Sequence, residues 1–240
     1  MQALGLDDLD LTPQKCYSRR FHDLQAEERF DAEYFNPKYQ RIIKRLREGG
    51  RTLADVVTLS ERYFDPAKLK SSTFHYVEIG SLTGNGEAES DTVQTADAPS
   101  RATWVVKPGD IITSTVRPIR RLSALIREDQ DGCVCSSGFA VLTPRQGVDG
   151  VEPEVLLTYM RLPVICEVLD LHTTASMYPA IAVQRLMQIP VMIPDKTRRE
   201  QIVAKVQEGM SLHRESVRLL TQAKKMLEDM VEGEKGVGRK

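Results

Sequence analysis

The stretch VKPGDIITSTVRPIRRLSALIRED, residues 106–129, decides how the middle of this chain folds. Its β-branched and apolar positions form two short strand candidates, and Arg117, Arg120 and Arg121 lie in the bend between them. Because Pro118 disfavours helical backbone at the residue before it, we expect Arg117 to be extended, with its side chain projecting from the bend. The bend is therefore either an ordinary solvated turn or a group of guanidinium donors that faces an anion.

The cations of this region are concentrated in a chain whose overall charge is balanced. The 240 residues contain 33 Lys and Arg and 34 Asp and Glu, a formal net charge of −1. Residues 101–127 hold six basic residues and one acidic residue, whereas residues 81–100 hold four acids and no Lys or Arg. This segregation fits one basic face on a neutral protein, as in nucleic-acid binding, and it fits chance clustering on a solvated hairpin equally well.

Length and composition indicate a folded protein with one large domain and appended helices. Hydrophobic residues make up 41% of the chain and charged residues 28%, which is enough apolar material for a core. The longest apolar runs are too short to span a bilayer, and the first 21 residues lack the continuous apolar segment of a secretion signal. We therefore expect a cytoplasmic protein without a membrane anchor.

The periodicity of the sequence divides the chain into five segments. We expect a polar lead-in over residues 1–30, an amphipathic helix over 31–50, a domain of short strands over 51–194, a long helix over 195–232 and a disordered tail over 233–240. Pro37 either occupies the first turn of the N-terminal helix or separates a leading turn from the main helix.

The central segment predicts an α+β fold with a mostly antiparallel sheet. Strand candidates at 102–106 and 111–116 are separated by the turn pair Pro108-Gly109. Residues 122–126 and 133–144 flank the Asp131-Gly132 turn and predict a hairpin. Residues 152–171 switch to helical spacing. The predicted fold is thus a sheet domain between an N-terminal helix and a long C-terminal, coiled-coil-like helix.

The C-terminal helix predicts a partner chain. Residues 197–231 contain no proline, and at 1.5 Å per residue they form a helix roughly 50 Å long, more than a domain of this size can cover. The residues expected to contact a partner helix are Ile202, Val206, Val217, Leu220 and Leu227. A second stripe beside them consists of Leu219, Ala223, Met226 and Met230.

No motif in the chain predicts catalysis. The sequence YFNPKY, residues 34–39, is similar to the Asn-Pro-Pro-Tyr loop of amino-methyltransferases, but Lys38 stands at the second proline and no glycine-rich cofactor loop precedes it. The four cysteines and four histidines lack metal-site spacing, so we expect buried reduced thiols and no metal. The chain is expected to be a binding protein without a cofactor of its own.

Four segments, taken in order, resemble the DNA specificity subunits of type I restriction-modification systems. They are GDIITSTVRPI (109–119), SSGFAVLTP (136–144), YPAIAVQRLMQIPVMIP (178–194) and REQIVAKV (199–206). The resemblance covers about residues 31–230 and corresponds to one target recognition domain with its spacer helix. A full specificity subunit carries two such sets. The chain is therefore either a natural half-subunit that dimerises or a piece of a longer polypeptide.

The resemblance implies a non-catalytic subunit that binds double-stranded DNA sequence-specifically. It also implies docking to DNA methyltransferase subunits, which bind S-adenosylmethionine and methylate adenine, with a restriction or translocase subunit as a further partner and a homodimer if the chain is a half-subunit. The candidate DNA contacts are Arg117, Arg120, Arg121, Ser114, Thr115, Lys107, His75 and Tyr178. Two alternatives stay open: a protein-interaction module that uses the long helix without reading DNA, and an enzyme whose site is assembled from scattered residues.

Overall fold

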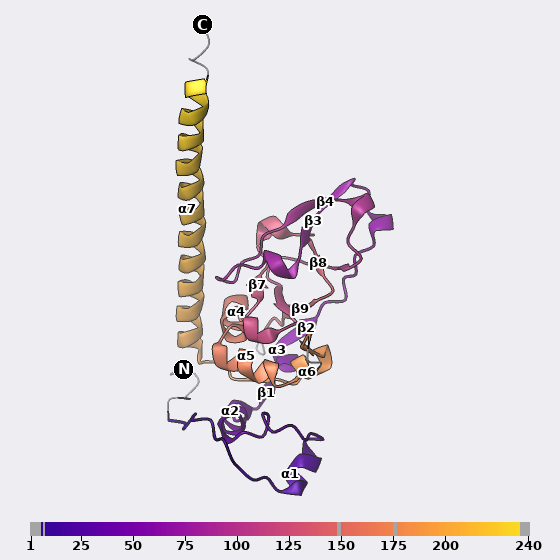
Figure 1. Ribbon diagram of the computed structural model, residues 1–240, viewed down its shortest axis with the longest axis vertical. Coiled ribbons are helices and arrows are strands. Elements are labelled where there is room, and N and C mark those ends of the chain that lie inside the picture. Colours follow the sequence, from indigo (N-terminus) through magenta and orange to yellow (C-terminus); the bar gives the residue numbers. More distant parts are fainter. Residues whose placement is uncertain (1–5, 7, 148–149, 175–176, 236–240) are drawn as a thin grey trace.

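The computed structural model describes residue 6 and residues 8–147, 150–174 and 177–235, the last four of these by their backbone only. The chain forms an α+β domain of two four-stranded sheets and short helices, and one long helix stands along its side (Figure 1). The predicted fold class is confirmed.

The first sheet lies at the centre of the domain and has the strand order β2-β9-β6-β7, with every pair antiparallel. Its strands are β2 (Val57–Leu59), β6 (Ile111–Ser114), β7 (Ser123–Leu125) and β9 (Phe139–Pro144). Successive residues of a strand point to opposite faces, so Ile111 packs into the core on the helical side and Ile112 into the core shared with the second sheet. Both faces of this sheet are therefore buried.

The second sheet has the order β4-β3-β8-β5. Its strands are β3 (Thr73–Val77), β4 (Asp91–Gln94), β5 (Ala102–Val105) and β8 (Val134–Ser136). The β3–β8 pair is parallel, and the other two pairs are antiparallel.

One strand pairing predicted from the sequence is wrong. Residues 122–126 do not form a hairpin with 133–144, because β7 pairs with β6 and the arginine bend is itself the hairpin connection. Strand β8 joins the second sheet instead, and the chain returns to the first sheet only at β9. The two strands flanking Pro108-Gly109 exist as predicted, but they belong to different sheets.

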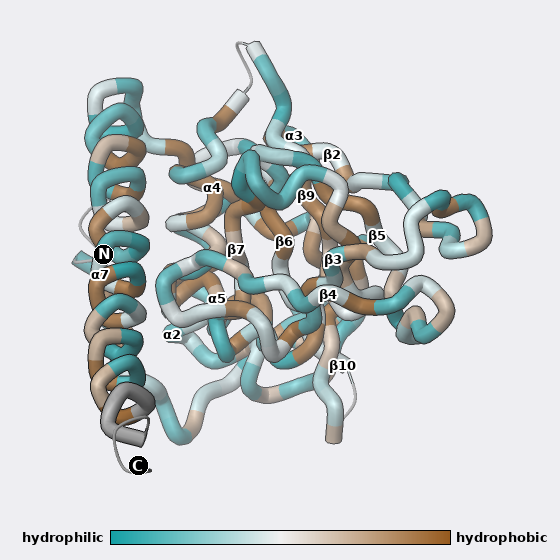
Figure 2. Tube along the Cα trace, turned by 90° about the horizontal axis from the view of Figure 1, so that it is seen from above, coloured by the Kyte–Doolittle hydropathy of each residue, from teal (hydrophilic) through white to brown (hydrophobic). Residues whose placement is uncertain are grey.

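Short helices cover the outer face of the first sheet. They are α3 (Leu53–Val56), α4 (Pro153–Met160), α5 (Pro163–Asp170) and α6 (Val183–Met187). Two further pairs of short strands are antiparallel. Strand β1 (Arg51–Thr52) pairs with β12 (Pro190–Val191), and β10 (Thr173–Thr174) pairs with β11 (Ala180–Ile181). Single 3-10 turns occur at η2 (Pro66–Lys68), η3 (Ile79–Ser81), η4 (Thr95–Asp97), η5 (Pro118–Arg120) and η6 (Glu128–Gln130). Figure 2 shows the apolar residues gathered in β6, β9 and α4 at the centre.

The N-terminal region has a shorter main helix than the sequence predicts. It contains α1 (Phe21–Ala26) and α2 (Pro37–Arg47). Helix α2 begins at Pro37 because the Asn36 side chain accepts a hydrogen bond from the Lys38 amide at 3.1 Å and caps the helix. A helix that starts at residue 31 is therefore wrong, and the alternative holds, in which a leading turn at residues 32–35 precedes the main helix at Pro37. The lead-in packs onto the domain, since Leu6 is buried in the same core as α2.

The long helix α7 (Lys196–Lys235) has 40 residues and a length of about 60 Å. It runs three residues past the predicted end, and the rest of the predicted tail, 236–240, lies outside the described residues. Its first half lies beside α4, and its second half extends away from the domain (Figure 1). None of the helices in the described part of the chain is long and apolar enough to cross a membrane.

Candidate nucleic-acid interface

The bend between β6 and β7 is built on two left-handed residues. Arg117 has φ 49° and ψ 61°, and Arg121 has φ 59° and ψ 35°, on either side of the η5 turn. The extended conformation predicted for Arg117 is therefore wrong. Its amide donates to the Pro179 carbonyl at 2.8 Å and its carbonyl accepts from the Arg120 amide at 3.0 Å. These contacts outweigh the local preference of a residue before proline.

The predicted hydroxyl donors beside the bend bind the protein's own backbone. Ser114 is buried, and its hydroxyl donates to the Val116 carbonyl at 2.8 Å. The Thr115 hydroxyl donates to the Gly138 carbonyl at 3.0 Å, which ties the bend to the crossing between β8 and β9. In this structure both side chains hold the shape of the bend.

Tyr178 lies next to Arg117, although 60 residues separate them in the sequence. The isolated bridge between Val116 and Ala180 brings the β10–β11 hairpin to the bend. The Arg117 guanidinium donates to the Met177 carbonyl at 3.1 Å and lies over the Tyr178 ring, 5.5 Å from its centroid. The structure thus brings Tyr178 together with the arginine bend.

Arg161, at the end of α4, also belongs to this group and is missed by the sequence analysis. Its guanidinium donates to the Arg121 carbonyl at 2.8 Å, to the Ser123 carbonyl at 3.0 Å and to the Gly84 carbonyl. Burial and the nearby positive charge of Arg121 lower the pKa of Arg161. No local sequence signal identifies this residue, because its acceptors are backbone groups from distant segments.

Arg117, Arg120 and Arg121 have no acidic partner. Within the described residues, no carboxylate lies within 4.0 Å of any of the three guanidinium groups. Arg127 of the same sequence stretch differs, because Asp129 accepts two hydrogen bonds from it at 2.9 and 3.1 Å. The bend therefore presents positive charge that the domain does not neutralise, in an arrangement that suits phosphate or base-edge acceptors.

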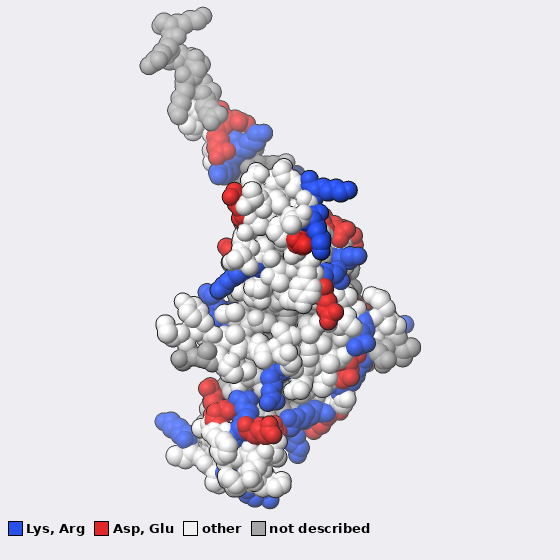
Figure 3. Space-filling model, turned by 90° about the vertical axis from the view of Figure 1, so that its right-hand side faces the viewer, with Lys and Arg blue, Asp and Glu red and all other residues white. Residues whose placement is uncertain are grey.

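Two of the predicted contacts lie elsewhere. Lys107 is exposed but sits before β6, at the end of that strand opposite the bend. His75 is exposed on β3 in the second sheet, opposite Thr92 of β4. On the face of the molecule in Figure 3, charges of both signs are interspersed around a largely uncharged centre. Lys107 and His75 therefore do not lie beside the arginine bend.

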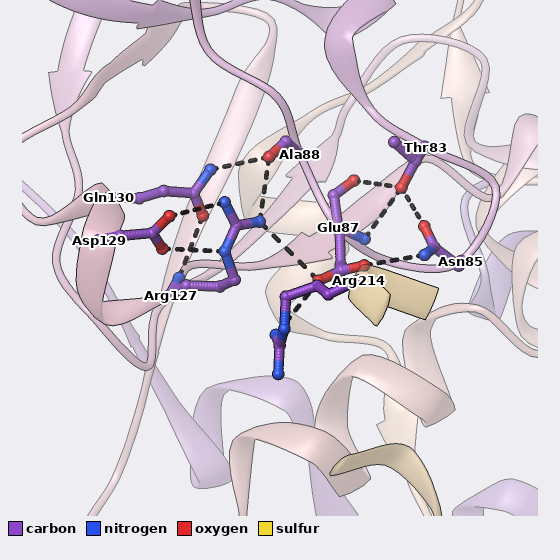
Figure 4. Close-up of polar contacts among 8 residues, drawn as sticks. All are labelled: Thr83, Asn85, Glu87, Ala88, Arg127, Asp129, Gln130 and Arg214. Carbon is purple, nitrogen blue, oxygen red and sulfur yellow. Dashed lines mark hydrogen bonds and ion pairs between the residues drawn. The ribbon is translucent and has the colours of Figure 1, made fainter. Parts of the chain in front are cut away.

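Helix α7 is joined to the domain by packing and by one buried carboxylate. Met210 is 9% exposed, and the Gln207 amide donates to Glu154 at 2.7 Å. Glu87, whose side chain is 6% exposed, lies 3.5 Å from Arg214 and 3.9 Å from Arg127 (Figure 4). After Arg214 every residue up to Val231 is exposed.

The residues of α7 that were predicted to contact a partner helix are partly covered by the domain and partly exposed. Ile202 and Val206 are partly buried against the chain's own core, so they are not free for a partner helix. Val217, Leu220 and Leu227 are 49%, 68% and 64% exposed. Leu212, Met226 and Met230 are also 64–69% exposed, so the second half of α7 carries a broad uncovered apolar surface.

The described residues contain no group of three or more His, Cys, Asp or Glu side chains arranged to hold a metal ion. Cys133, Cys135 and Cys166 are buried free thiols, and burial raises the pKa of each. Cys16 is exposed.

Comparisons with known proteins agree with this architecture. No protein-family model matches the chain. The specificity subunit of the type I restriction enzyme HindI from Haemophilus influenzae is 24% identical over 154 residues, which are 63% of this chain and 33% of that protein. The solved HsdS subunit from Thermoanaerobacter tengcongensis is 31% identical, with a TM-score of 0.57. A chain solved in work on complex assembly and conformational transition of the type I R-M system is 32% identical, with a TM-score of 0.58.

Both structural matches cover 75% of this chain and 46% of the other one. The chain thus spans about half the length of the solved proteins and a third of the curated relative. In sequence and in fold, the chain is a relative of the specificity subunits of type I restriction-modification systems.

Proposed function

We propose that this chain is a non-catalytic specificity component that binds double-stranded DNA in a sequence-dependent way. The observation that carries the proposal is the group Arg117, Arg120 and Arg121, which has no acidic partner among the described residues. Guanidinium groups gathered on one bend suit both phosphate contacts and bidentate recognition of guanine. The relationship to specificity subunits supports the same ligand class.

The partners follow from the same relationship. In the proposed complex, DNA methyltransferase subunits bind S-adenosylmethionine and methylate adenine after it leaves the duplex stack, while this chain selects the site. A restriction or translocase subunit would use the same selection to direct cleavage. The exposed half of α7 supplies a surface on which another protein chain can dock.

The sharpest test starts from a random duplex library. Duplexes retained by the purified chain are sequenced, and the enriched duplex and a scrambled one are titrated at several salt concentrations. Replacing all three bend arginines by alanine should weaken binding to the enriched duplex, by about 1–3 kcal/mol for each arginine that reads a base. An arginine that contacts only phosphate should weaken binding to both duplexes and reduce the salt slope by about one unit.

A matched control removes three exposed cations remote from the bend, Lys68, Lys70 and Lys205. This variant should keep its preference for the enriched duplex. Enrichment of no duplex, or equal binding by wild type and the bend variant, would reject DNA reading by this site. In that case the exposed apolar surface of α7 favours the second candidate function, a protein-interaction module.

A further inference from the structure

We infer that Tyr178 stacks on a nucleobase that the bound duplex exposes at a distorted base step. The inference rests on the proposed function and adds to it a mode of contact, in which an aromatic ring held by Arg117 meets the face of a base. Two features carry the inference: the exposure of this side chain and the way in which the arginine bend fixes it.

Two large apolar side chains are uncovered at the loop of the β10–β11 hairpin. Tyr178 is 69% exposed and Met177 is 76% exposed. Neither residue belongs to the apolar clusters of the domain. An adjacent aromatic and thioether side chain, left uncovered beside a cationic bend, indicates a contact surface for a ligand that has both negative charge and flat apolar faces.

The backbone around Tyr178 is fixed on both sides. The Met177 carbonyl accepts from the Arg117 guanidinium at 3.1 Å, and the Pro179 carbonyl accepts from the Arg117 amide at 2.8 Å. Arg117 adopts a left-handed conformation to make these contacts, and such backbone strain in a non-glycine residue is concentrated at functional sites. The backbone that carries the ring is thus held by two hydrogen bonds, which lowers the entropy lost on binding.

The surrounding chemistry selects nucleic acid as the ligand. The Arg117 guanidinium lies over the Tyr178 ring, and Arg120 lies three residues further along the bend with its side chain exposed. A nucleotide offers a phosphate to such cations and a π-face to the ring. In an intact duplex the base faces are stacked, so this contact requires an opened or kinked step, as apolar side chains produce in other DNA complexes.

The test uses the full chain and the duplex enriched in the selection described above, with 2-aminopurine placed in turn at each adenine. Its fluorescence rises when a base loses its stacking neighbours. Wild type and Tyr178→Phe should raise the fluorescence at a base that borders the opened step without lying on the ring, because that base loses a stacking neighbour. Tyr178→Ala should abolish the rise and weaken binding at least fivefold, since stacking of one base on an aromatic side chain contributes a factor of roughly 5 to 150. The matched control is Tyr63→Ala, which removes a tyrosine of similar exposure, 67%, whose ring lies tilted against Trp104 at 4.8 Å between centroids.

The outcomes separate this inference from the proposed function. Specific binding without a fluorescence rise at any position, or an equal rise with Tyr178→Ala, would overturn base stacking and leave DNA reading intact. A Tyr178→Ala variant that binds DNA as wild type but no longer assembles with methyltransferase subunits would also overturn it, in favour of a protein contact. Enrichment of no duplex would overturn both proposals.

Discussion

Arg161 shows how a single side chain can fix the shape of a bend to which it does not itself belong. It donates to three backbone carbonyls, those of Arg121 in the bend, of Ser123 at the start of β7 and of Gly84. The hydrogen bond to the Ser123 carbonyl is partly buried, so water replaces the guanidinium there less easily than at the two exposed carbonyls. We regard it as a positioning residue for the arginine bend.

We predict that Arg161→Met lowers the free energy of unfolding by about 1–3 kcal/mol, because it leaves carbonyl groups without a charged donor. Urea denaturation measures this change. The control is Arg185→Met, which removes an exposed arginine that makes one long hydrogen bond to Gln188. If Arg161→Met and Arg185→Met unfold at the same urea concentration, the three hydrogen bonds have no net effect on stability.

The sequence could identify the arginines of the site but not their geometry. Arg117, Arg120 and Arg121 stand out because they are crowded into one turn between two apolar runs. The conformation of Arg117 depends on carbonyls that lie 60 or more residues away, and no local rule contains that contact. The role of the three arginines in binding therefore stays a prediction, and only the predicted backbone shape of Arg117 is wrong.

At the level of elements, the sequence predicts strands and helices better than their partners. Every strand candidate around Pro108-Gly109 is a strand, because β-branched residues and a turn pair act locally. Which sheet each strand joins depends on packing across the whole domain, and this is why the predicted pairing of 122–126 with 133–144 failed. The sequence alone does not decide at which residue α2 begins, because Pro37 fits either in the first turn of the helix or just before it.

The joint between α7 and the domain should depend on Glu87. Its carboxylate is nearly inaccessible to solvent, accepts from Asn85 at 2.9 Å and faces two arginines (Figure 4). We predict that Glu87→Gln lowers the free energy of unfolding by about 1–3 kcal/mol, because Arg127 and Arg214 lose their shared negative partner. Denaturant titration at constant pH measures the loss.

Glu208→Gln provides the comparison for this prediction. Glu208 is an exposed residue of α7 close to Arg214, so its replacement should change the free energy of unfolding by less than about 0.5 kcal/mol. Equal effects of the two substitutions would show that Glu87 does not stabilise the joint.

At the scale of the whole molecule, the free half of α7 has the pattern of a coiled-coil seam. Its outer seam, spaced by alternating steps of four and three residues, consists of Leu212, Ser216, Leu219, Ala223, Met226 and Met230. At 100° per residue, this seam lies roughly 160° around the helix from the side that packs on the domain. A second copy of the chain could therefore pair with it without displacing the domain.

We predict that the chain is a homodimer through this outer seam. Leu219→Glu with Met226→Glu should convert it to a monomer of 27.0 kDa in light scattering, because two charges cannot be buried in an apolar interface. The control is Lys225→Glu, which changes charge on another side of the helix. A wild-type monomer at micromolar concentration would reject the homodimer and favour a longer natural polypeptide or a different partner.

In the proposed dimer, the unsupported part of α7 would set the scale of the distance between the two domains. From Glu215 to Lys235 the helix rises about 30 Å, and 30 Å along B-form DNA corresponds to roughly nine base pairs. Two domains held apart by such helices would each touch their own end of the target. The base pairs in the middle would meet no side chain from either end, and their identity would be free to vary from one target to the next.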